Sequence, residues 1–149
     1  MINYREMIAL DIPVLVGMEK DIYPESPWSA AQFREELAGV PNSRKYLVAI
    51  ENNEIIGYGG IALAGDVADI HTLTVIPDFR RRGIATEILH QLEAWATSKG
   101  ITAFMLEMRE GNSQAQPLYE KHGYSVISRR DNYYSPGIHA LIMRKEAGK

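Results

Sequence analysis

The sequence of 149 residues contains no cysteine, no long apolar run and no signal-peptide pattern. Without cysteine the chain cannot form disulfides, thiolate metal sites or a covalent intermediate on a cysteine nucleophile. No apolar stretch approaches the roughly 18–20 residues that cross a membrane. The first residues, Met1 to Glu6, lack the basic and then apolar layout of a signal peptide. We therefore expect a cytoplasmic protein that does not bind membranes.

A strong charge of either sign is absent too. The 16 Lys and Arg residues against 19 Asp and Glu residues give a formal net charge of −3, which does not favour a nucleic acid as a direct partner. The Walker pattern and the Gly-x-Gly-x-x-Gly pattern are both missing, which argues against a P-loop or a dinucleotide fold. No spacing of His, Asp and Glu indicates a metal site.

What is present is an ordinary globular pattern along the whole chain. Apolar residues make up 46% and charged residues 23%, so we expect one domain, residues 1–149, that is a monomer or a weak homodimer. Periodicity predicts helices over about residues 11–20, 29–39, 84–98 and 113–121, and strands over about residues 2–7, 46–50, 55–63, 69–75, 102–108, 124–128 and 138–143. This order predicts an α/β or α+β fold, a mixed sheet of about seven strands with about four helices on its faces.

A basic turn joins the strand before Pro77 to the long helix that follows. The turn consists of Arg80, Arg81, Arg82, Gly83, Ile84 and Ala85. It places arginines and free backbone N–H groups at a helix N-terminus, where the helix dipole favours an anion. Gly83 lets a ligand approach the backbone closely, and Ala85 adds no bulk in the first turn. The turn therefore predicts a phosphate site, although a short basic turn taken alone is often only solvated surface.

A second motif follows the fifth predicted strand. Its residues are Asn112, Ala115, Leu118, Tyr119, Glu120, Gly123 and Tyr124. Together with the Arg-x-x-Gly-x-Ala turn, it resembles the signature motifs of the GCN5-related N-acetyltransferase (GNAT) family, and the resemblance runs over essentially the whole chain. It implies the GNAT fold, with the fourth and fifth strands splayed apart, and acetyl-CoA as co-substrate. The basic turn would then bind the pyrophosphate of CoA.

Further residues resemble one branch of this family, the RimI-type alanine N-acetyltransferases of ribosomal proteins. They are Pro27-Trp28-Ser29 with Phe33, Glu107, Arg129-Arg130 with Asn132-Tyr133-Tyr134, and residues 139–143. The resemblance implies that the partner is a protein N-terminus, the N-terminal alanine of a small-subunit ribosomal protein. It also implies Glu107 as the general base and Tyr119 as the general acid that protonates the CoA sulfur.

Elementary chemistry agrees with a glutamate base for an N-terminal amine. A protein α-amino group has a pKa of about 7.7–8.0, against about 10.4 for lysine, so deprotonating a lysine costs roughly 3.4 kcal/mol more. A single glutamate therefore suits an N-terminal acceptor better. Alternation along the strand places Glu107 on the face opposite Leu106. A strand glutamate that only faces solvent would show the same pattern.

The cofactor-binding candidates could also have purely structural roles. A tyrosine, with a pKa near 10, suits protonation of a thiolate, but Tyr119 could also be a core residue that Pro117 displaces within its helix. Asn112 either contacts the pantetheine arm or caps the helix. By the same resemblance, Leu73, Thr74 and Val75 offer main-chain groups to the pantetheine amides, and one N–H could polarise the thioester carbonyl.

Acceptor binding rests on the weakest signals. His71 is a rival base, or otherwise a structural or substrate-contacting residue, and alternation places it on the same strand face as Asp69 and Leu73. Trp28, Tyr133 and Tyr134 are predicted to lie on loops, where aromatic side chains with one polar end suit peptide recognition. Trp28 could equally pack within a lid.

Three functions are compatible with these residues. The first is acetylation of protein N-termini by direct attack in a ternary complex, since no cysteine can carry the acetyl group. The second is acetylation of a small amine or an antibiotic, and the third is a non-catalytic sensor that binds acyl-CoA. A peptide acceptor requires an open groove lined by Trp28 and Tyr134, whereas a small amine requires a closed acidic pocket.

Overall fold

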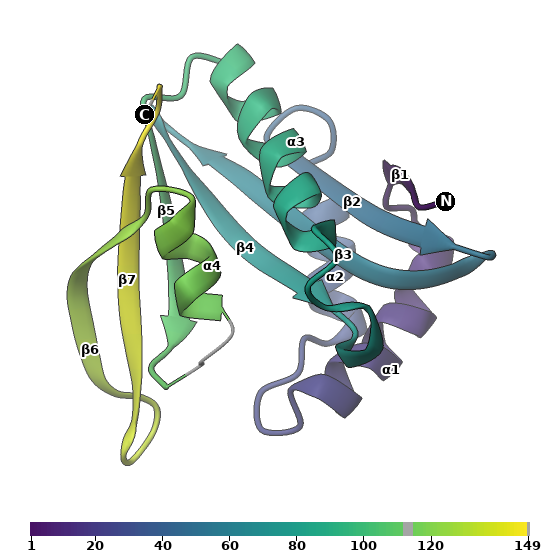
Figure 1. Ribbon diagram of the computed structural model, residues 1–149, viewed down its shortest axis with the longest axis horizontal. Coiled ribbons are helices and arrows are strands. Elements are labelled where there is room, and N and C mark those ends of the chain that lie inside the picture. Colours follow the sequence, from purple (N-terminus) through teal and green to yellow (C-terminus); the bar gives the residue numbers. More distant parts are fainter. Residues whose placement is uncertain (112–114, 149) are drawn as a thin grey trace.

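A computed structural model describes residues 1–111 and 115–148 of the chain. Over these residues, seven strands form one sheet in the order β1-β2-β3-β4-β5-β7-β6. β4 and β5 are parallel and the other neighbours are antiparallel. Helices lie against both faces of the sheet (Figure 1). The predicted mixed sheet with helices on its faces is confirmed, and no helix of the described residues is long and apolar enough to span a membrane.

The order of elements agrees with the order that periodicity predicts. The strands are β1 (Asn3–Glu6), β2 (Arg44–Glu51), β3 (Glu54–Ala64), β4 (Val67–Val75), β5 (Ala103–Arg109), β6 (Ser125–Ser135) and β7 (Ile138–Glu146). The helices are α1 (Ile12–Ile22), α2 (Ala30–Leu37), α3 (Ile84–Ser98) and α4 (Ala115–Lys121), with short 3-10 turns at Ala9–Asp11 and Pro77–Phe79.

The last two strands are longer than the sequence predicts. β6 pairs with β7 as far as Ser135 opposite Ile138, and Gly137, at φ 81°, closes the hairpin between them. Tyr133 and Tyr134 therefore lie within β6, and their predicted placement on a loop is wrong. The register with β7 shifts between Arg130 and Ser135, and within this stretch the Asn132 N–H donates to His139 Nδ1 at 2.9 Å.

The predicted helix starts have different local chemistry. Ser29 caps α2: its Oγ accepts from the N–H of Gln32 at 3.2 Å, and the Gln32 side chain accepts from the Ser29 N–H at 2.8 Å. Asp11 precedes α1 but does not cap it. Its carboxylate instead accepts two hydrogen bonds from the Arg5 guanidinium at 2.8 Å each and one from the Ile8 N–H at 2.9 Å.

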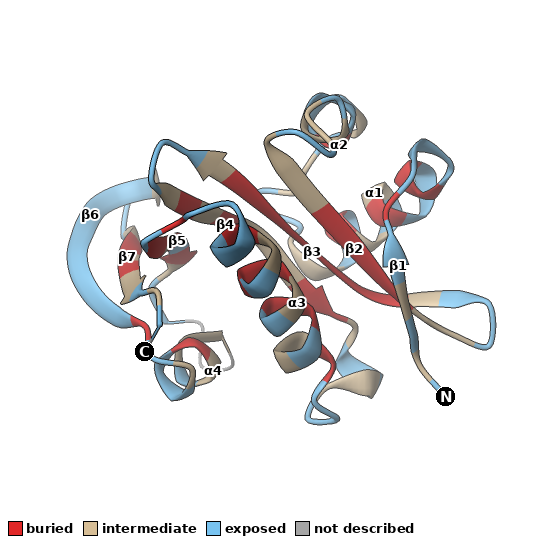
Figure 2. Ribbon diagram, turned by 90° about the horizontal axis from the view of Figure 1, so that it is seen from above, coloured by how far each residue is buried: buried red, intermediate tan, exposed pale blue. Residues whose placement is uncertain are grey.

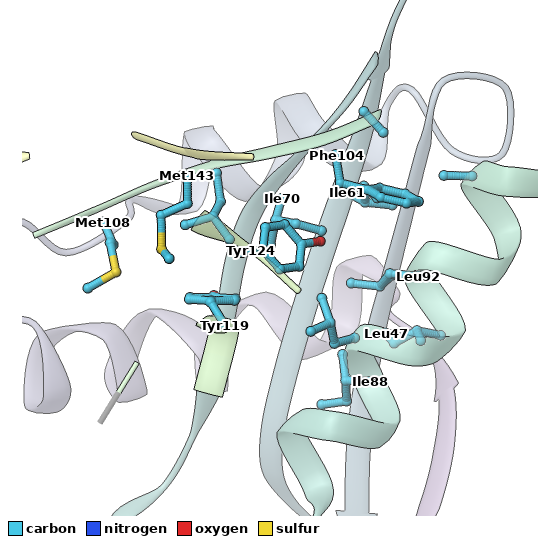
Figure 3. Close-up of a cluster of buried hydrophobic side chains, with 14 of the residues drawn as sticks. Leu47, Ile61, Ile70, Ile88, Leu92, Phe104, Met108, Tyr119, Tyr124 and Met143 are labelled. Atoms are coloured by element: carbon cyan, nitrogen blue, oxygen red, sulfur yellow. The ribbon is translucent and has the colours of Figure 1, made fainter. Parts of the chain in front are cut away.

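The sheet separates two clusters of buried side chains, with α1 and α2 on one face and α3 and α4 on the other (Figure 2). Alternation along β2 serves both: Leu47 and Ala49 face α3, whereas Tyr46 and Val48 face α1 and α2. The α3 side holds the larger cluster, which includes Ile61, Ile70, Ile88, Leu92, Phe104, Met108 and Met143 (Figure 3).

Two glycines of β3 allow neighbouring side chains to pack closely. A Cβ atom on Gly60 would lie 2.0 Å from the Tyr46 ring, and one on Gly59 would lie 2.7 Å from the Ile88 side chain. The close approach therefore comes from side chains on both faces of the sheet.

β4 and β5 separate along their length. Their parallel pairing covers only Val67–Ile70 of β4, opposite Ala103, Phe104, Met105 and Leu106 of β5. Beyond this point the two strands diverge (Figure 1), while β3 stays paired with β4 as far as Val75. The splay is confirmed, and it leaves one backbone edge of β4 without a strand partner over residues 71–75.

Candidate active site

The basic turn forms the N-terminus of α3. Gly83 precedes the helix in the left-handed region at φ 79°, and no described side chain caps the helix. The first helical N–H groups, those of Ile84 and Ala85, therefore have no acceptor within the helix. They point away from the helix at the positive end of its dipole. This geometry fits a phosphate group.

The three arginines of the turn have different surroundings. The Arg80 Nε donates to the carbonyl oxygen of Val75 at 3.0 Å, which fastens the turn to the end of β4. The guanidinium of Arg82 lies 4.7 Å from the centre of the Phe79 ring and 3.9 Å from the Glu51 carboxylate. Arg81 is exposed and has a positive φ of 67°. All three cations remain close to the start of α3.

The edge of β4 beside the splay suits a ligand with amide groups. Leu73, Thr74 and Val75 pair with β3 on one side and have no strand on the other. The side chain of Thr74 is buried and shares a 2.8 Å hydrogen bond with the Tyr23 hydroxyl. Backbone amides can therefore be offered to the pantetheine arm of CoA as in strand addition.

A β-bulge reorients His71. Gly60 pairs with Thr72 and Ile61 with Ile70, so His71 is the extra residue of β4. Leu73 packs with the cluster under α3, whereas His71 contacts Glu36 on α2. The prediction that His71 and Leu73 share a face is wrong, because the bulge interrupts the alternation.

His71 belongs to a polar cluster with α2 and β2. Its Nδ1 lies 2.8 Å from Glu36 Oε1, which also accepts from the Tyr46 hydroxyl at 2.9 Å and from the Arg44 Nε at 2.7 Å. Burial alone would raise the pKa of Glu36, but the hydrogen bond from Tyr46 and the nearby His71 and Arg44 hold that pKa below its usual range. Glu36 is therefore ionised at neutral pH.

Glu107 faces the same side of the sheet as His71. Its neighbours Leu106 and Met108 are buried on the α3 side, and Glu107 points the other way, with its carboxylate 3.9 Å from the Arg130 guanidinium. Burial, and next the Glu107 carboxylate, raise the pKa of Tyr134. The face opposite Leu106 is confirmed for Glu107, which lies among the side chains of β6.

Tyr119 approaches the splay from the other side. It is buried at 6% exposure in the cluster under α3, with its ring 5.6 Å from that of Tyr124 (Figure 3). No hydrogen bond joins its hydroxyl to the described residues. Burial, and next the Tyr23 hydroxyl, raise the pKa of Tyr119 well above its usual value, so the hydroxyl keeps its proton. Pro117 lies within the first turn of α4, where a missing N–H costs nothing.

A cavity of about 450 Å³ opens between the segment after α1 and the β6–β7 hairpin. The Arg109 guanidinium crosses its wall, 2.7 Å from the Glu25 carboxylate and 5.3 Å from the centre of the Tyr134 ring. The rest of the lining comes from Ser26, Ser135, Pro136 and Ile138. Tyr134 therefore lines a cavity, but Trp28 does not, so the expected groove lined by both residues is not found among the described residues.

Trp28 and Tyr133 lie apart from this cavity lining. The Trp28 ring centre is 5.2 Å from that of Phe33 and 6.4 Å from those of Tyr46 and His71, so it packs against the α2 side of the site. Tyr133 is 49% exposed, and its ring lies 5.3 Å from the Arg130 guanidinium. Asn112 falls outside the described residues.

Two buried or half-buried acids beside the site escape sequence reasoning. Glu19 on α1 is 2% exposed and accepts hydrogen bonds from the Tyr58 hydroxyl and, at 2.8 Å, from the Trp28 N–H. Burial raises the pKa of Glu19. The second neighbour, Glu36, reads as a polar residue of a short amphipathic helix. The one signal in the sequence is that each acid lies on the buried side of a helix. The partners of Glu19 and Glu36 lie too far away along the chain to be predicted.

Several comparisons place this arrangement among known proteins. The profile described as "Acetyltransferase (GNAT) family" matches residues 13–124. The "Putative [ribosomal protein bS18]-alanine N-acetyltransferase" of Bacillus subtilis is 33% identical over 140 residues, which cover 93% of this chain and 91% of that protein. The "N-alpha-acetyltransferase RimI" of Mycobacterium tuberculosis is 33% identical over 129 residues, 83% of this chain and 78% of that protein.

Two further comparisons concern length and fold. An uncharacterized protein of Mycobacterium leprae is 36% identical over 128 residues, and the match spans only 34% of its length. The crystal structure of the ribosomal-protein-S18-alanine N-acetyltransferase from Escherichia coli has a TM-score of 0.86 at 23% identity, over 100% of this chain and 96% of that one. The profile match, the identity to relatives of similar length and the splayed sheet all agree: this chain belongs to the GNAT acetyltransferase family.

Proposed function

We propose that this protein transfers the acetyl group of acetyl-CoA to the α-amino group of a protein N-terminus, with the N-terminal alanine of a small-subunit ribosomal protein as the favoured acceptor. The observation that carries the proposal is the position of Glu107, on the strand that splays away from β4 and on the face of the acceptor cavity. Relatives from Bacillus subtilis and Haemophilus influenzae are named as bS18-alanine N-acetyltransferases. The reaction would take place in the cytoplasm, where ribosomal proteins are made.

The cofactor half of the site is formed by the basic turn and the free edge of β4. Arg80, Arg81, Arg82 and the N–H groups of Gly83, Ile84 and Ala85 would hold the pyrophosphate. Leu73, Thr74 and Val75 would bind the pantetheine amides, and Asn112 is a further candidate for that arm. When bound, acetyl-CoA supplies an activated acetyl group as a thioester. The protein then has only to orient the thioester and to accept and donate protons.

The proton transfers are assigned to two side chains. Glu107 removes a proton from the acceptor ammonium, directly or through a water, and the neutral nitrogen attacks the thioester carbonyl. A C–N bond forms and the nitrogen gives its second proton to a further acceptor, while the C–S bond breaks and the Tyr119 hydroxyl gives its proton to the departing sulfur. The raised pKa of Tyr119 means that the hydroxyl is protonated at neutral pH and is a weaker acid than a free tyrosine. No enzyme-bound acetyl group is needed, because attack is direct.

The cavity beside Tyr134 favours a peptide over a small polycation. Its lining contains one carboxylate, Glu25, and that group is already paired with Arg109. A cationic antibiotic would require several unpaired acids. Trp28, His71 and Tyr133 complete the acceptor side, where they would contact the first residues of the peptide. A sensor that only binds acyl-CoA needs neither Glu107 nor Tyr119 in these positions.

A screen of short peptides that differ only in their first residue tests the proposal. The protein is incubated with acetyl-CoA and each peptide, and mass spectrometry locates the acetyl group. We expect acetylation of the α-amino group, fastest for alanine, and none of a matched peptide whose N-terminus is blocked and which contains an internal lysine. Acetylation of the lysine alone, or of small amines alone, would contradict the proposed acceptor. No transfer to any amine would favour the sensor.

A further inference from the structure

His71 and Glu36 form a carboxylate–imidazole pair at the edge of the acceptor site. His71 Nδ1 lies 2.8 Å from Glu36 Oε1, and the two side chains are 29% and 14% exposed. Glu36 is ionised and is held in place by hydrogen bonds from Tyr46 at 2.9 Å and from Arg44 at 2.7 Å. The carboxylate therefore has a fixed position and orients the imidazole.

This pairing fixes the tautomer of His71. An ionised carboxylate can only accept, so Nδ1 must carry the hydrogen that lies between the two groups. In the neutral ring Nε2 is then the atom with the free lone pair. No hydrogen bond joins Nε2 to any of the residues that the structure describes. The same logic operates in hydrolase triads, where a carboxylate orients a histidine and stabilises its protonated form.

The bulge turns this imidazole toward the face of the sheet on which Glu107 lies. Ile70 and Leu106 are the last paired residues of β4 and β5, so His71 and Glu107 each come one position later, across the start of the splay. Both side chains lie on the face of α1 and α2. The acceptor nitrogen, placed between the two strands, would meet Glu107 from one side and His71 from the other.

Proton counting shows why a second acceptor is useful. An α-ammonium group must lose one proton before it attacks and a second as the amide forms, whereas the leaving sulfur takes up only one, from Tyr119. Glu107 accounts for the first proton. We propose that His71, oriented by Glu36, is a further catalytic residue whose Nε2 accepts the second proton as the C–N bond forms and the C–S bond breaks. This inference rests on the proposed function.

The charged groups around His71 set the expected pH dependence. Glu36 faces it from α2, and Arg44 and the Tyr46 hydroxyl belong to the same cluster on β2. Glu107 lies on the neighbouring strand β5 and on the same face of the sheet. His71 can act only when neutral, so kcat should fall on the acid side in wild type. In this scheme Glu36 is a positioning residue, because it reaches the acceptor only through His71.

Two substitutions test the pair with saturating acetyl-CoA and an alanine-initiated peptide. His71→Asn keeps a donor near the place of Nδ1 but removes Nε2. It should lower kcat on the order of 10²-fold and remove the part of the acid limb that His71 contributes, so that only the part due to Glu107 remains. Glu36→Gln should lower kcat and move the acid limb to lower pH, because the protonated imidazole loses its carboxylate. His90→Asn, an exposed histidine on α3 at the opposite face of the sheet, is the matched control and should change neither.

Binding of CoA and thermal melting show that the variants are folded, since neither Glu36 nor His71 belongs to the cofactor half. If both variants keep the wild-type kcat and pH profile, His71 is not a proton acceptor, although the enzyme remains an N-acetyltransferase. A uniform drop in kcat with an unmoved acid limb in Glu36→Gln would also overturn the inference. If wild type acetylates no N-terminal peptide, the proposed function itself fails, which is a separate outcome.

Discussion

The two faces of the sheet bury very different kinds of side chain. Under α3 and α4 the buried cluster is almost entirely apolar, and its buried acid, Glu93, accepts from the Tyr124 hydroxyl at 2.6 Å and from Lys145 at 2.9 Å. Under α1 and α2 a smaller cluster surrounds the tyrosines that bind Glu19 and Glu36. The difference indicates that one face mainly holds the fold and the other carries the polar chemistry.

Buried polar groups are costly unless they are paired, which explains how the α1 and α2 face is organised. No buried side-chain nitrogen or oxygen among the described residues lacks a partner. Glu19 fixes the backbone at Trp28, and Glu36 fixes His71. An unpaired amide or hydroxyl costs about 1–3 kcal/mol. The network therefore specifies one arrangement of the acceptor side instead of contributing much net stability.

Removing apolar volume from the α3 face should affect stability most. Leu92 is fully buried between α3 and the sheet (Figure 3), so Leu92→Ala should lower the free energy of unfolding by about 2–5 kcal/mol. Leu10→Ala, at a leucine that is 85% exposed, is the control and should change it by less than about 0.5 kcal/mol. Denaturant unfolding measures both. Equal effects would contradict the stabilising role of the apolar cluster under α3.

Tyr119 is the residue of the apolar face to which we assign chemistry. Tyr119→Phe should lower kcat by on the order of 10²-fold and leave CoA affinity largely intact, because only the proton donor is lost. Its neighbour Tyr124 provides the control, since its hydroxyl serves Glu93. Tyr124→Phe should cost about 1 kcal/mol of stability with little effect on kcat. If CoA affinity collapses in Tyr119→Phe, the hydroxyl is a cofactor contact and not the acid.

Substitutions in the basic turn should have the smallest of these effects, and they should change only the affinity for CoA. Arg80→Ala removes one cation and its bond to Val75, so CoA should bind roughly tenfold more weakly, as expected for one charged hydrogen bond. Gly83→Glu, which adds a negative charge and a side chain at positive φ, should weaken binding as well. Arg34→Ala, on the exposed side of α2, is the control. Equal affinities by calorimetry would contradict a phosphate site.

The cofactor half is predictable from the sequence because its signals are local. Arg80, Gly83 and Ala85 follow one another in a single turn, and strand order places that turn beside β4. Glu107 is also accessible to sequence reasoning, because two-residue alternation along β5 fixes its face without knowledge of distant contacts. The roles of these residues remain predictions that the experiments above address.

The acceptor half depends on contacts between distant parts of the chain, which a single sequence does not reveal. Glu36 and His71 are 35 positions apart, and the bulge that turns His71 toward Glu36 interrupts the alternation on which its predicted face relied. The extension of β6 through Tyr133 and Tyr134 has the same origin, since it depends on the hairpin with β7, whose register shifts between Arg130 and Ser135. Trp28 is held by packing against Phe33 and by the hydrogen bond from its N–H to Glu19. No local sequence pattern indicates these two contacts.

The most direct test of the account compares Glu107→Gln with wild type on an alanine-initiated peptide at saturating acetyl-CoA. Glu110→Gln is the matched control. Glu110 directly follows the same strand, and its carboxylate lies 3.2 Å from the Arg129 guanidinium. We predict that Glu107→Gln lowers kcat by about 10²–10⁴-fold with unchanged CoA affinity, while Glu110→Gln keeps wild-type turnover. Unchanged turnover by Glu107→Gln would contradict the assignment of the proton-accepting base and, with it, the catalytic role of this face.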